Sequence, residues 1–388
     1  MPAKSTTPKP AKPYPDFPLF PHATGRWAKK IRGRLHYFGP WRDPDGALEE
    51  YQRVRDDLYA GRTPRPAQEG VEVRDVANAF LSSRERKVEA GELKRATLDE
   101  YIHTMRQVAD ALGRRSVVEG LRADDFARLR AVLAKRYGPA GVAKRIQITR
   151  MAFKHAYEAD LIDRPPKYGP EFKRPSKAVF RRQRDARPRR MFEADELRQI
   201  VEAARGPLRA IVLLGINCGW GQYDIANVEK RHFQLDAGTV NYPRPKTGIE
   251  REAVLWPETV DAVAEALEHR PEPLNAAHDD LVFLTRWGHP WARYRSRGDG
   301  SGVAVDSVNL QFNKLLTRLG LKRRGVAFYA LRHSFQTIAE GAGDPAAVER
   351  IMGHSTDDMA SRYRERIDRE RLQRVADHVR GWWLGGGR

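Results

Sequence analysis

The chain has 388 residues, with 70 Lys and Arg against 51 Asp and Glu, so its formal net charge is +19. Hydrophobic residues make up 40% of it, which excludes a chain that is disordered throughout. The length predicts two or three domains. The excess of cations favours a polyanionic partner such as nucleic acid, although a ribosome-associated or simply soluble basic protein would show the same balance.

The cysteine and apolar content narrow the class of protein further. Cys218 is the single cysteine, which excludes an intrachain disulfide and a zinc site built on cysteines. The apolar run at 211–216 is far shorter than the roughly 20 residues that a membrane helix needs. Residues 1–18 lack the apolar stretch of a secretory signal. We therefore expect a cytoplasmic protein with no membrane partner.

The N-terminal part is predicted to contain a tail and a small folded module. Residues 1–22 are rich in Lys and Pro, so we expect a flexible basic tail. In residues 23–65, two β-prone runs flank Arg32-Gly33, which predicts a tight hairpin turn, and a helix is predicted from about 45 to 60. The density of cations among aromatic residues favours a DNA-contacting module over a capping subdomain. Its expected DNA contacts are Lys29, Lys30, Arg32 and Arg34.

A helical domain is predicted over residues 71–165, after a linker at 61–70 that is punctuated by Pro and Gly. Apolar residues recur at helical spacing in four successive stretches. The last stretch has Ile146 and Phe153 on its apolar face, and its other face is almost wholly cationic. A solvated surface is the default interpretation of such a face, but the sign of its charge favours phosphate contact. The predicted contacts are Lys144, Arg145, Arg150 and Lys154.

Residues 166–190 are predicted to form a second, basic linker, because runs of arginine stand there among prolines. Such a segment would wrap a DNA duplex, with Arg181 and Arg182 among its contacts. From 191 to 388 the pattern is again mostly helical, with a strand-like stretch at 239–255.

Three motifs of this last region carry the chemistry. They are Tyr329-Ala-Leu-Arg332, Gly353-His354 and Arg362-Tyr363. Singly each is a weak signal, because a lone His on a helix is more often structural and a Tyr among arginines is usually just exposed. Their order and spacing resemble the catalytic domain of the tyrosine recombinases, the phage integrase family, where H-x-x-R, G-H and the nucleophilic Tyr follow one another.

The resemblance extends towards the N-terminus. Residues 245–248, Pro-Lys-Thr-Gly, resemble the β-hairpin that carries the family's catalytic lysine. Residues 71–162 resemble the family's core-binding domain and residues 23–62, more loosely, its arm-site-binding module. The resemblance implies a mainly α multidomain fold: a small β-sheet plus helix at the N-terminus, a SAM-like helical bundle, and a mostly α catalytic domain with a small β-sheet.

The resemblance also implies a reaction. Tyr363 would attack a DNA phosphate and form a 3′-phosphotyrosyl link that preserves the bond energy, so no cofactor and no metal is expected. Arg332 and His354 would hydrogen-bond to phosphoryl oxygens that gain negative charge in the transition state. Lys246 would give a proton to the departing 5′ hydroxyl. Tyr329 stands in place of the family's first histidine and would retain one hydrogen bond.

The implied partner is double-stranded DNA, with a homotetramer assembled on it and accessory DNA-bending proteins nearby. The activity would integrate or excise a mobile element, such as a phage, in the nucleoid of a prokaryote. Two roles stay open for the C-terminal segment at 382–384, Trp-Trp-Leu, which either packs on its own domain or docks on a neighbouring protomer.

One departure from the family is serious. The family's first arginine belongs to a T-G-x-R-x-x-E/D pattern, and Gly221 stands at its position, in a register anchored by Gly219 and Asp224. Loss of one such donor costs on the order of 100- to 1000-fold in rate, about 3–4 kcal/mol. Arg231, Arg251 or an arginine of the linker could replace it.

Two other functions therefore stay open. A cleavage-deficient DNA-binding relative that acts as an architectural or regulatory protein would tolerate Gly221, although it would have no chemical need for Tyr363. A type IB topoisomerase shares the active-site chemistry, but the arm-like N-terminus and the separate helical domain favour recombination.

Overall fold

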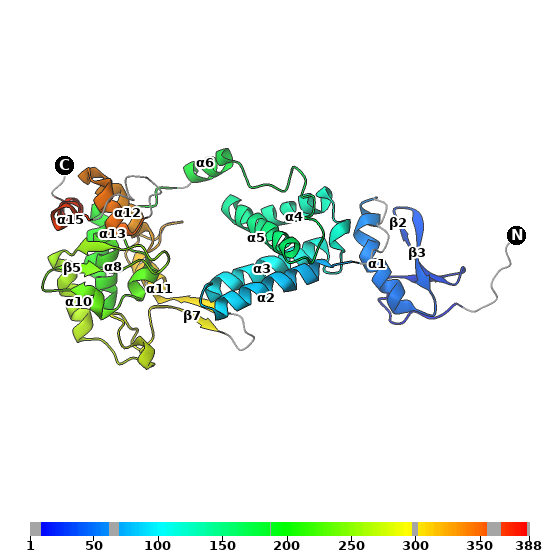
Figure 1. The fold of residues 1–388 in the computed structure, drawn as a ribbon, viewed down its shortest axis with the longest axis horizontal. Coiled ribbons are helices and arrows are strands. Elements are labelled where there is room, and N and C mark those ends of the chain that lie inside the picture. Colours follow the sequence, from blue (N-terminus) through cyan, green and yellow to red (C-terminus); the bar gives the residue numbers. More distant parts are fainter. Residues whose placement is uncertain (1–8, 62–69, 187, 297–301, 355–365, 386–388) are drawn as a thin grey trace. The chain divides into compact units, whose positions relative to one another are not determined.

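The computed structural model describes residues 9–61, 70–186, 188–296, 302–354 and 366–385 (Figure 1). These residues are mostly helical and form small antiparallel sheets, which confirms the predicted fold class. The chain divides into two compact units. One comprises residues 1–82, 104–136 and 144–173, and the other comprises 83–103, 137–143 and 174–388.

The N-terminal module is a three-stranded antiparallel sheet covered by one helix. Its elements are β1 (Phe20–His22), β2 (Arg26–Ile31), β3 (Arg34–Pro40) and α1 (Pro44–Tyr59). The predicted turn at Arg32-Gly33 is confirmed, with φ values of 48° and 81°. Positive φ at both central residues matches the twist of a two-residue hairpin, and glycine adopts it without strain.

The prediction of a flexible tail up to residue 22 is wrong for its last part. Phe17 and Leu19 are buried in the module's core, and the Phe17 ring centroid lies 5.0 Å from that of Trp27. Strand β1 pairs with β2 immediately afterwards. A two-stranded hairpin is barely stable alone, so the third strand and the apolar side chains just before it complete the core. Residues 1–8 lie outside the described residues, as do 62–69 of the first linker.

The predicted helical domain contains the four expected helices. They are α2 (Val73–Glu89), α3 (Arg95–Leu112), α4 (Ala123–Arg136) and α5 (Pro139–Glu158), with a short 3₁₀ turn η1 (Val118–Gly120). Its core includes Phe80, Phe126 and Phe153, all fully buried. The basic linker is more ordered than predicted, because residues Lys177–Asp185 form helix α6, which buries no side chain.

The C-terminal domain is a helical core with two small sheets. Its helices are α7 (Ala194–Ala203), α8 (Pro207–Asn217), α9 (Gln222–Ala226), α10 (Pro257–Glu268), α11 (Ser307–Arg318), α12 (Ala330–Ala339), α13 (Pro345–Met352) and α15 (Arg369–Leu384). Short 3₁₀ turns are η2 (Lys230–His232), η3 (Ala276–His278) and η4 (Glu340–Ala342). The sheets are β4 (Phe233–Gln234), β5 (Thr239–Asn241) and β6 (Glu252–Val254), and separately β7 (Ala292–Ser296) with β8 (Gly302–Asp306).

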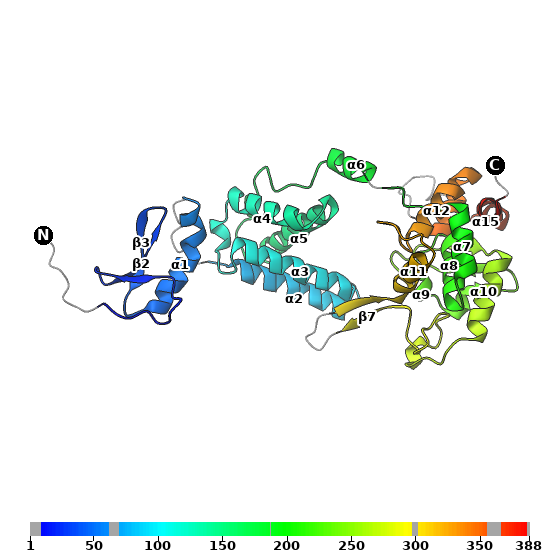
Figure 2. The ribbon, with the colours of Figure 1, turned by 180° about the vertical axis from the view of Figure 1, so that it is seen from behind.

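Helix α8 forms the centre of this domain. Its residues 210–217 are all buried. Helices α7, α10, α11, α12 and α15 all pack against it, and Figure 2 shows them gathered around it. A helix that is covered on every side must be apolar all round, which explains the run at 211–216. Within the described part of the chain, no helix has the length and apolar character needed to cross a membrane.

The C-terminal helix α15 packs on its own domain, which settles where its apolar side chains are buried. Leu372, Val375 and Val379 join the domain core. The Trp383 ring stacks on Trp256, with centroids 5.2 Å apart and an interplanar angle of 8°. The main-chain oxygen of Trp383 also accepts a hydrogen bond of 2.5 Å from Arg198.

Candidate active site

Three segments far apart in sequence meet around Arg332, in the first turn of α12. Its side chain is only 3% exposed. Nη1 donates to the main-chain oxygen of Gly219, at 2.6 Å, and Nη2 donates to that of Met352, at 3.0 Å. The buried guanidinium therefore ties the loop before α9 to the end of α13.

His354 stands just after α13 and completes this junction. The predicted start of α13 is confirmed, because the Asp344 side chain accepts a hydrogen bond from Ala347 N and Pro345 is the first helical residue. The helix ends at Gly353 with φ of 64°, a conformation that favours glycine. His354 Nε2 then lies 2.5 Å from Nη2 of Arg332.

The contact between these two side chains defines the protonation state of the imidazole. A guanidinium only donates hydrogen bonds, so Nε2 of His354 accepts, and the proton of the neutral ring belongs on Nδ1. Burial lowers the pKa of His354 below its usual range, and the charges of Arg332 and Arg244 lower it further. Burial also lowers the pKa of Arg332, to about 10, which leaves it charged at neutral pH.

The position of the family's first arginine is open in this chain. Gly221 precedes α9 with φ of −80° and ψ of 156°, an extended conformation that any residue can adopt. A Cβ atom added there would lie 3.4 Å from Cε2 of Tyr329, an ordinary van der Waals contact. The half-exposed Tyr329 ring thus lies beside the place where that arginine side chain would begin.

The candidate replacements named from the sequence differ in position. Arg231 is 74% exposed and pairs with Glu229 at 2.7 Å. Arg251 is completely buried, and its Nη1 lies 2.9 Å from Asp224 Oδ2. The rings of Trp220 and Tyr242 flank its guanidinium, with centroids 4.4 and 5.0 Å from Cζ.

Sequence reasoning missed a further arginine, Arg244. Its Nη1 donates to the main-chain oxygen of Gly353 at 3.2 Å, and its Nε lies 3.9 Å from Asp224 Oδ2. Its position two residues before Lys246, in the segment that joins β5 and β6, was the available signal. Lys246 itself is exposed in the turn of that segment. Tyr363, the predicted nucleophile, lies outside the described residues.

The predicted DNA contacts of the N-terminal module lie mainly on its hairpin. Lys30, Arg32 and Arg34 are exposed. Lys29 instead points towards α1, where its Nζ lies 4.9 Å from the ring centroid of Tyr51. It is half-buried, so the hairpin presents three of the four predicted cations to solvent.

The cationic face of α5 is smaller than predicted. The expectation that Arg145 lies on it is wrong, because this side chain is 8% exposed and its Nε donates to Gln107 Oε1 at 3.3 Å. Arg150 is exposed but donates to the main-chain oxygen of Phe172 at 2.7 Å. The remaining predicted contacts are exposed on α5 and α6, and they are Lys144, Lys154, Arg181 and Arg182.

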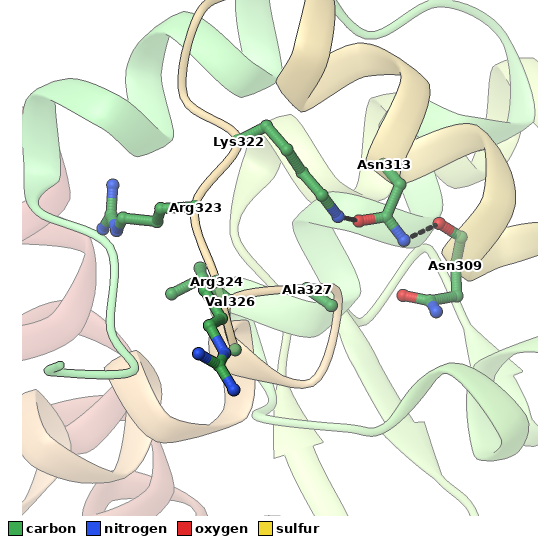
Figure 3. Close-up of a pocket in the computed structure, with 8 residues that line it drawn as sticks. Asn309, Asn313, Lys322, Arg323, Arg324, Val326 and Ala327 are labelled. Atoms are coloured by element: carbon green, nitrogen blue, oxygen red, sulfur yellow. Dashed lines mark hydrogen bonds between the residues drawn. The ribbon is translucent and has the colours of Figure 1, made fainter. Parts of the chain in front are cut away.

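A shallow basic pocket lies in the segment that leads to α12 (Figure 3). Lys322 donates to Asn313 Oδ1 across it, and Arg323 is held by Glu196. None of the described catalytic candidates lines this pocket. Its full lining is Asn309, Asn313, Lys322, Arg323, Arg324, Gly325, Val326 and Ala327.

No curated protein matches this chain. Among solved structures, a lambda integrase tetramer bound to a Holliday junction is 17% identical, covers 92% of this chain and 99% of that chain, and has a TM-score of 0.53. The Tn1549 transposon integrase in complex with transposon right end DNA is 13% identical, covers 80% of this chain and 100% of that chain, and has a TM-score of 0.56.

At these identities the structural likeness shows a shared fold. The sequence itself matches the Phage integrase family over residues 190–370, the region that contains Gly221, Arg332 and His354. Residues 190–370 of this chain therefore form a domain of the phage integrase family.

Proposed function

We propose that this chain is a site-specific DNA recombinase that cleaves and rejoins DNA through a 3′-phosphotyrosyl intermediate, to integrate or excise a mobile element. The observation that carries the proposal is the contact between Arg332 and His354. It joins a side chain from the first turn of α12 to one that stands just after α13, where a cationic and a neutral donor can act on one phosphate.

The hydrogen bonds of Arg332 leave part of its guanidinium for a ligand. Its five N–H groups include three that already donate, to Gly219, Met352 and His354. The two others, Nε–H and one Nη1–H, can each donate to a phosphoryl oxygen. Nδ1–H of His354 can donate a further bond. Such donors act most strongly where water is excluded, as in this buried junction.

In the strand transfer, one bond to phosphorus forms as another breaks, and each proton has a donor and an acceptor. The Tyr363 oxygen attacks phosphorus as its proton passes to solvent, and the bond from phosphorus to the 5′ oxygen breaks. The ammonium of Lys246 gives the leaving 5′ oxygen a proton. The 5′ hydroxyl of a second strand then attacks the phosphotyrosine and releases Tyr363, so each new phosphodiester retains the energy of the old one.

The partner of this reaction is double-stranded DNA. The lambda and Tn1549 integrases that share the fold are described in complex with DNA, one of them as a tetramer, which supports a homotetramer assembled on DNA here. We assign residues 23–65 to arm-type sites, 71–165 and the linker 166–190 to the core site, and 191–388 to catalysis. Accessory DNA-bending proteins and a place in the prokaryotic nucleoid belong to the same proposal.

Covalent capture from a randomised duplex pool tests the proposal, because such a pool contains the DNA site whatever its sequence is. The full-length protein is incubated with duplexes that carry nicks. After cleavage, the short fragment with the freed 5′ hydroxyl dissociates, so the strand cannot be rejoined. Detergent-resistant complexes are isolated, and the attached strands are sequenced. We expect one enriched core sequence, attached through a 3′ phosphate to Tyr363, and no capture by Tyr363→Phe.

The same pool distinguishes the other functions. Enrichment of a sequence by native binding but never by covalent capture would identify a cleavage-deficient binder. Covalent capture without any preferred sequence, together with relaxation of supercoiled plasmid, would identify a topoisomerase. Capture that persists in Tyr363→Phe would assign the nucleophile to another residue.

A further inference from the structure

Two guanidinium groups bind consecutive carbonyl groups at the end of α13. Arg332 Nη2 donates to Met352 O at 3.0 Å, and Arg244 Nη1 donates to Gly353 O at 3.2 Å. The next residue is His354. Both cations lie close enough for their charges to lower the pKa of the His354 imidazole, although one comes from α12 and the other from the segment between β5 and β6.

Asp224 holds the second cation from the other side. Its Oδ2 lies 2.9 Å from Arg251 Nη1 and 3.9 Å from Arg244 Nε. Arg251 has no exposed surface, whereas the side chain of Arg244 is 20% exposed. Arg251 is therefore placed to hold the carboxylate, and Arg244 is placed to reach a ligand.

The guanidinium of Arg244 has N–H groups that are not used in hydrogen bonds to described residues. Its Nε is buried and makes no hydrogen bond to any described residue. One Nη1–H is used by Gly353, so N–H groups of the same guanidinium remain for an anion. The partly exposed edge of Arg244 gives this anion access from solvent.

We propose that Arg244 is the second cationic donor to the scissile phosphate, in the role that the arginine missing at Gly221 would have, and that Arg251 is a positioning residue that acts through Asp224. This inference rests on the proposed recombinase function. It deepens that function by naming the residue that compensates for Gly221.

The charges of the site agree with this role. Arg244, Arg251 and Arg332 with Asp224 leave a net charge of two positive units, with His354 neutral. A phosphodiester carries one negative charge, and the five-coordinate phosphorus of the transition state carries a second. Without Arg244 the same site would hold one positive unit against two negative ones.

The first measurement compares Arg244→Ala and Arg244→Lys with the wild type on the DNA captured above. The rate of covalent complex formation in a single turnover should fall about 100- to 1000-fold for Arg244→Ala, as for loss of one oxyanion donor. DNA affinity should stay within about threefold, because one phosphate contact among many is lost. Arg231→Ala is the matched control, since this exposed arginine pairs with Glu229, and it should cleave like the wild type.

Two rescue experiments separate a role at the phosphate from a structural one. In Arg244→Ala, the added change Gly221→Arg should restore at least about tenfold in rate, because the backbone and space at 221 accept a side chain. A substrate with a methylphosphonate at the scissile position carries no charge there. The defect of Arg244→Ala and of Arg244→Lys should shrink on it, because less negative charge needs a cation.

The outcomes keep the two proposals distinguishable. If the wild type forms no complex that depends on Tyr363, the recombinase function fails and this inference falls with it. If the wild type cleaves and Arg244→Ala cleaves equally fast, the inference alone is overturned. It is also overturned if a folded Arg244→Lys shows the same defect on phosphate and methylphosphonate DNA and Gly221→Arg restores nothing.

Discussion

Nε2 of His354 accepts a hydrogen bond from Nη2 of Arg332 over 2.5 Å, so a buried cation donates to a neutral imidazole. The two residues are 22 positions apart, and the pair joins the start of α12 to the end of α13. This arrangement makes the stability of the domain depend on the protonation state of the imidazole.

The pH dependence of stability should reveal this pair. Burial and neighbouring arginines lower the pKa of His354 from its ordinary value of 6.5. Between that lowered pKa and 6.5 the unfolded chain binds more protons, so the free energy of unfolding should fall as the pH drops below about 6.5. Urea unfolding of the wild type and of His354→Gln at several pH values measures it. The variant should show a shallower decline, and an identical decline would contradict the assignment.

Arg332 should serve both folding and cleavage. Arg332→Ala leaves the carbonyls of Gly219 and Met352 without their donor, which should cost about 2–4 kcal/mol of stability. Arg332→Lys retains the charge but not the planar fork, so it should fold better and still cleave at least about 100-fold more slowly. Single-turnover cleavage and DNA binding of the folded lysine variant test whether Arg332 acts in cleavage as well as in folding. Equal losses of binding and cleavage would show a purely structural role.

Arg251 and Arg244 should differ in what they contribute to stability. Arg251→Met leaves the Asp224 carboxylate in a site with only 14% exposure, which should cost about 3–5 kcal/mol. Arg244→Met breaks a longer, partly exposed pair and should cost about 1 kcal/mol or less. The double variant Arg251→Met with Asp224→Leu should regain part of the loss, because the poorly exposed carboxylate is removed together with its buried partner. Chemical denaturation compares all of these, and equal losses from both arginines would refute the division of roles.

The hairpin of the N-terminal module should contribute to DNA binding through its exposed cations. Lys30→Gln and Arg34→Gln should each make the fall of log affinity with log salt concentration shallower by about 0.9 in slope, if each side chain neutralises one phosphate. Lys29→Gln is a matched control, because its ammonium lies over the Tyr51 ring, and it should change the slope less. Binding titrations at several salt concentrations test this on arm-type DNA, and unchanged slopes for all three would remove the module from the DNA interface.

Local patterns were sufficient for much of the fold. The turn at Arg32-Gly33 and the start of α13 at Asp344-Pro345 depend on the conformational preferences of neighbouring residues, so they could be predicted from a few positions. The apolar periodicity of α1 and of the four helices at 73–158 was equally local. The family motifs around Arg332 and His354 could be recognised because their spacing along the chain is itself a sequence property.

Errors arose where a residue's role depends on what packs against it. The segment at 17–22 follows a polar, Pro-rich stretch, yet Phe17 fills the core of the N-terminal module. Arg145 belongs to a cationic stripe, but its side chain turns inwards to Gln107. Neither outcome follows from composition, because each depends on the surface that the rest of the fold presents.

By itself, the sequence determined the likeness of residues 190–370 to the phage integrase family, the order of the elements and the absence of an arginine at position 221. Only the tertiary structure decided which side chains surround that position. Arg244 meets Gly353 across 109 positions, and Asp224 meets both Arg244 and Arg251, because three separate segments fold into one core. Spacing along a chain fixes neighbours within a helix or a turn, whereas the distance between remote residues is set by the packing of the whole core.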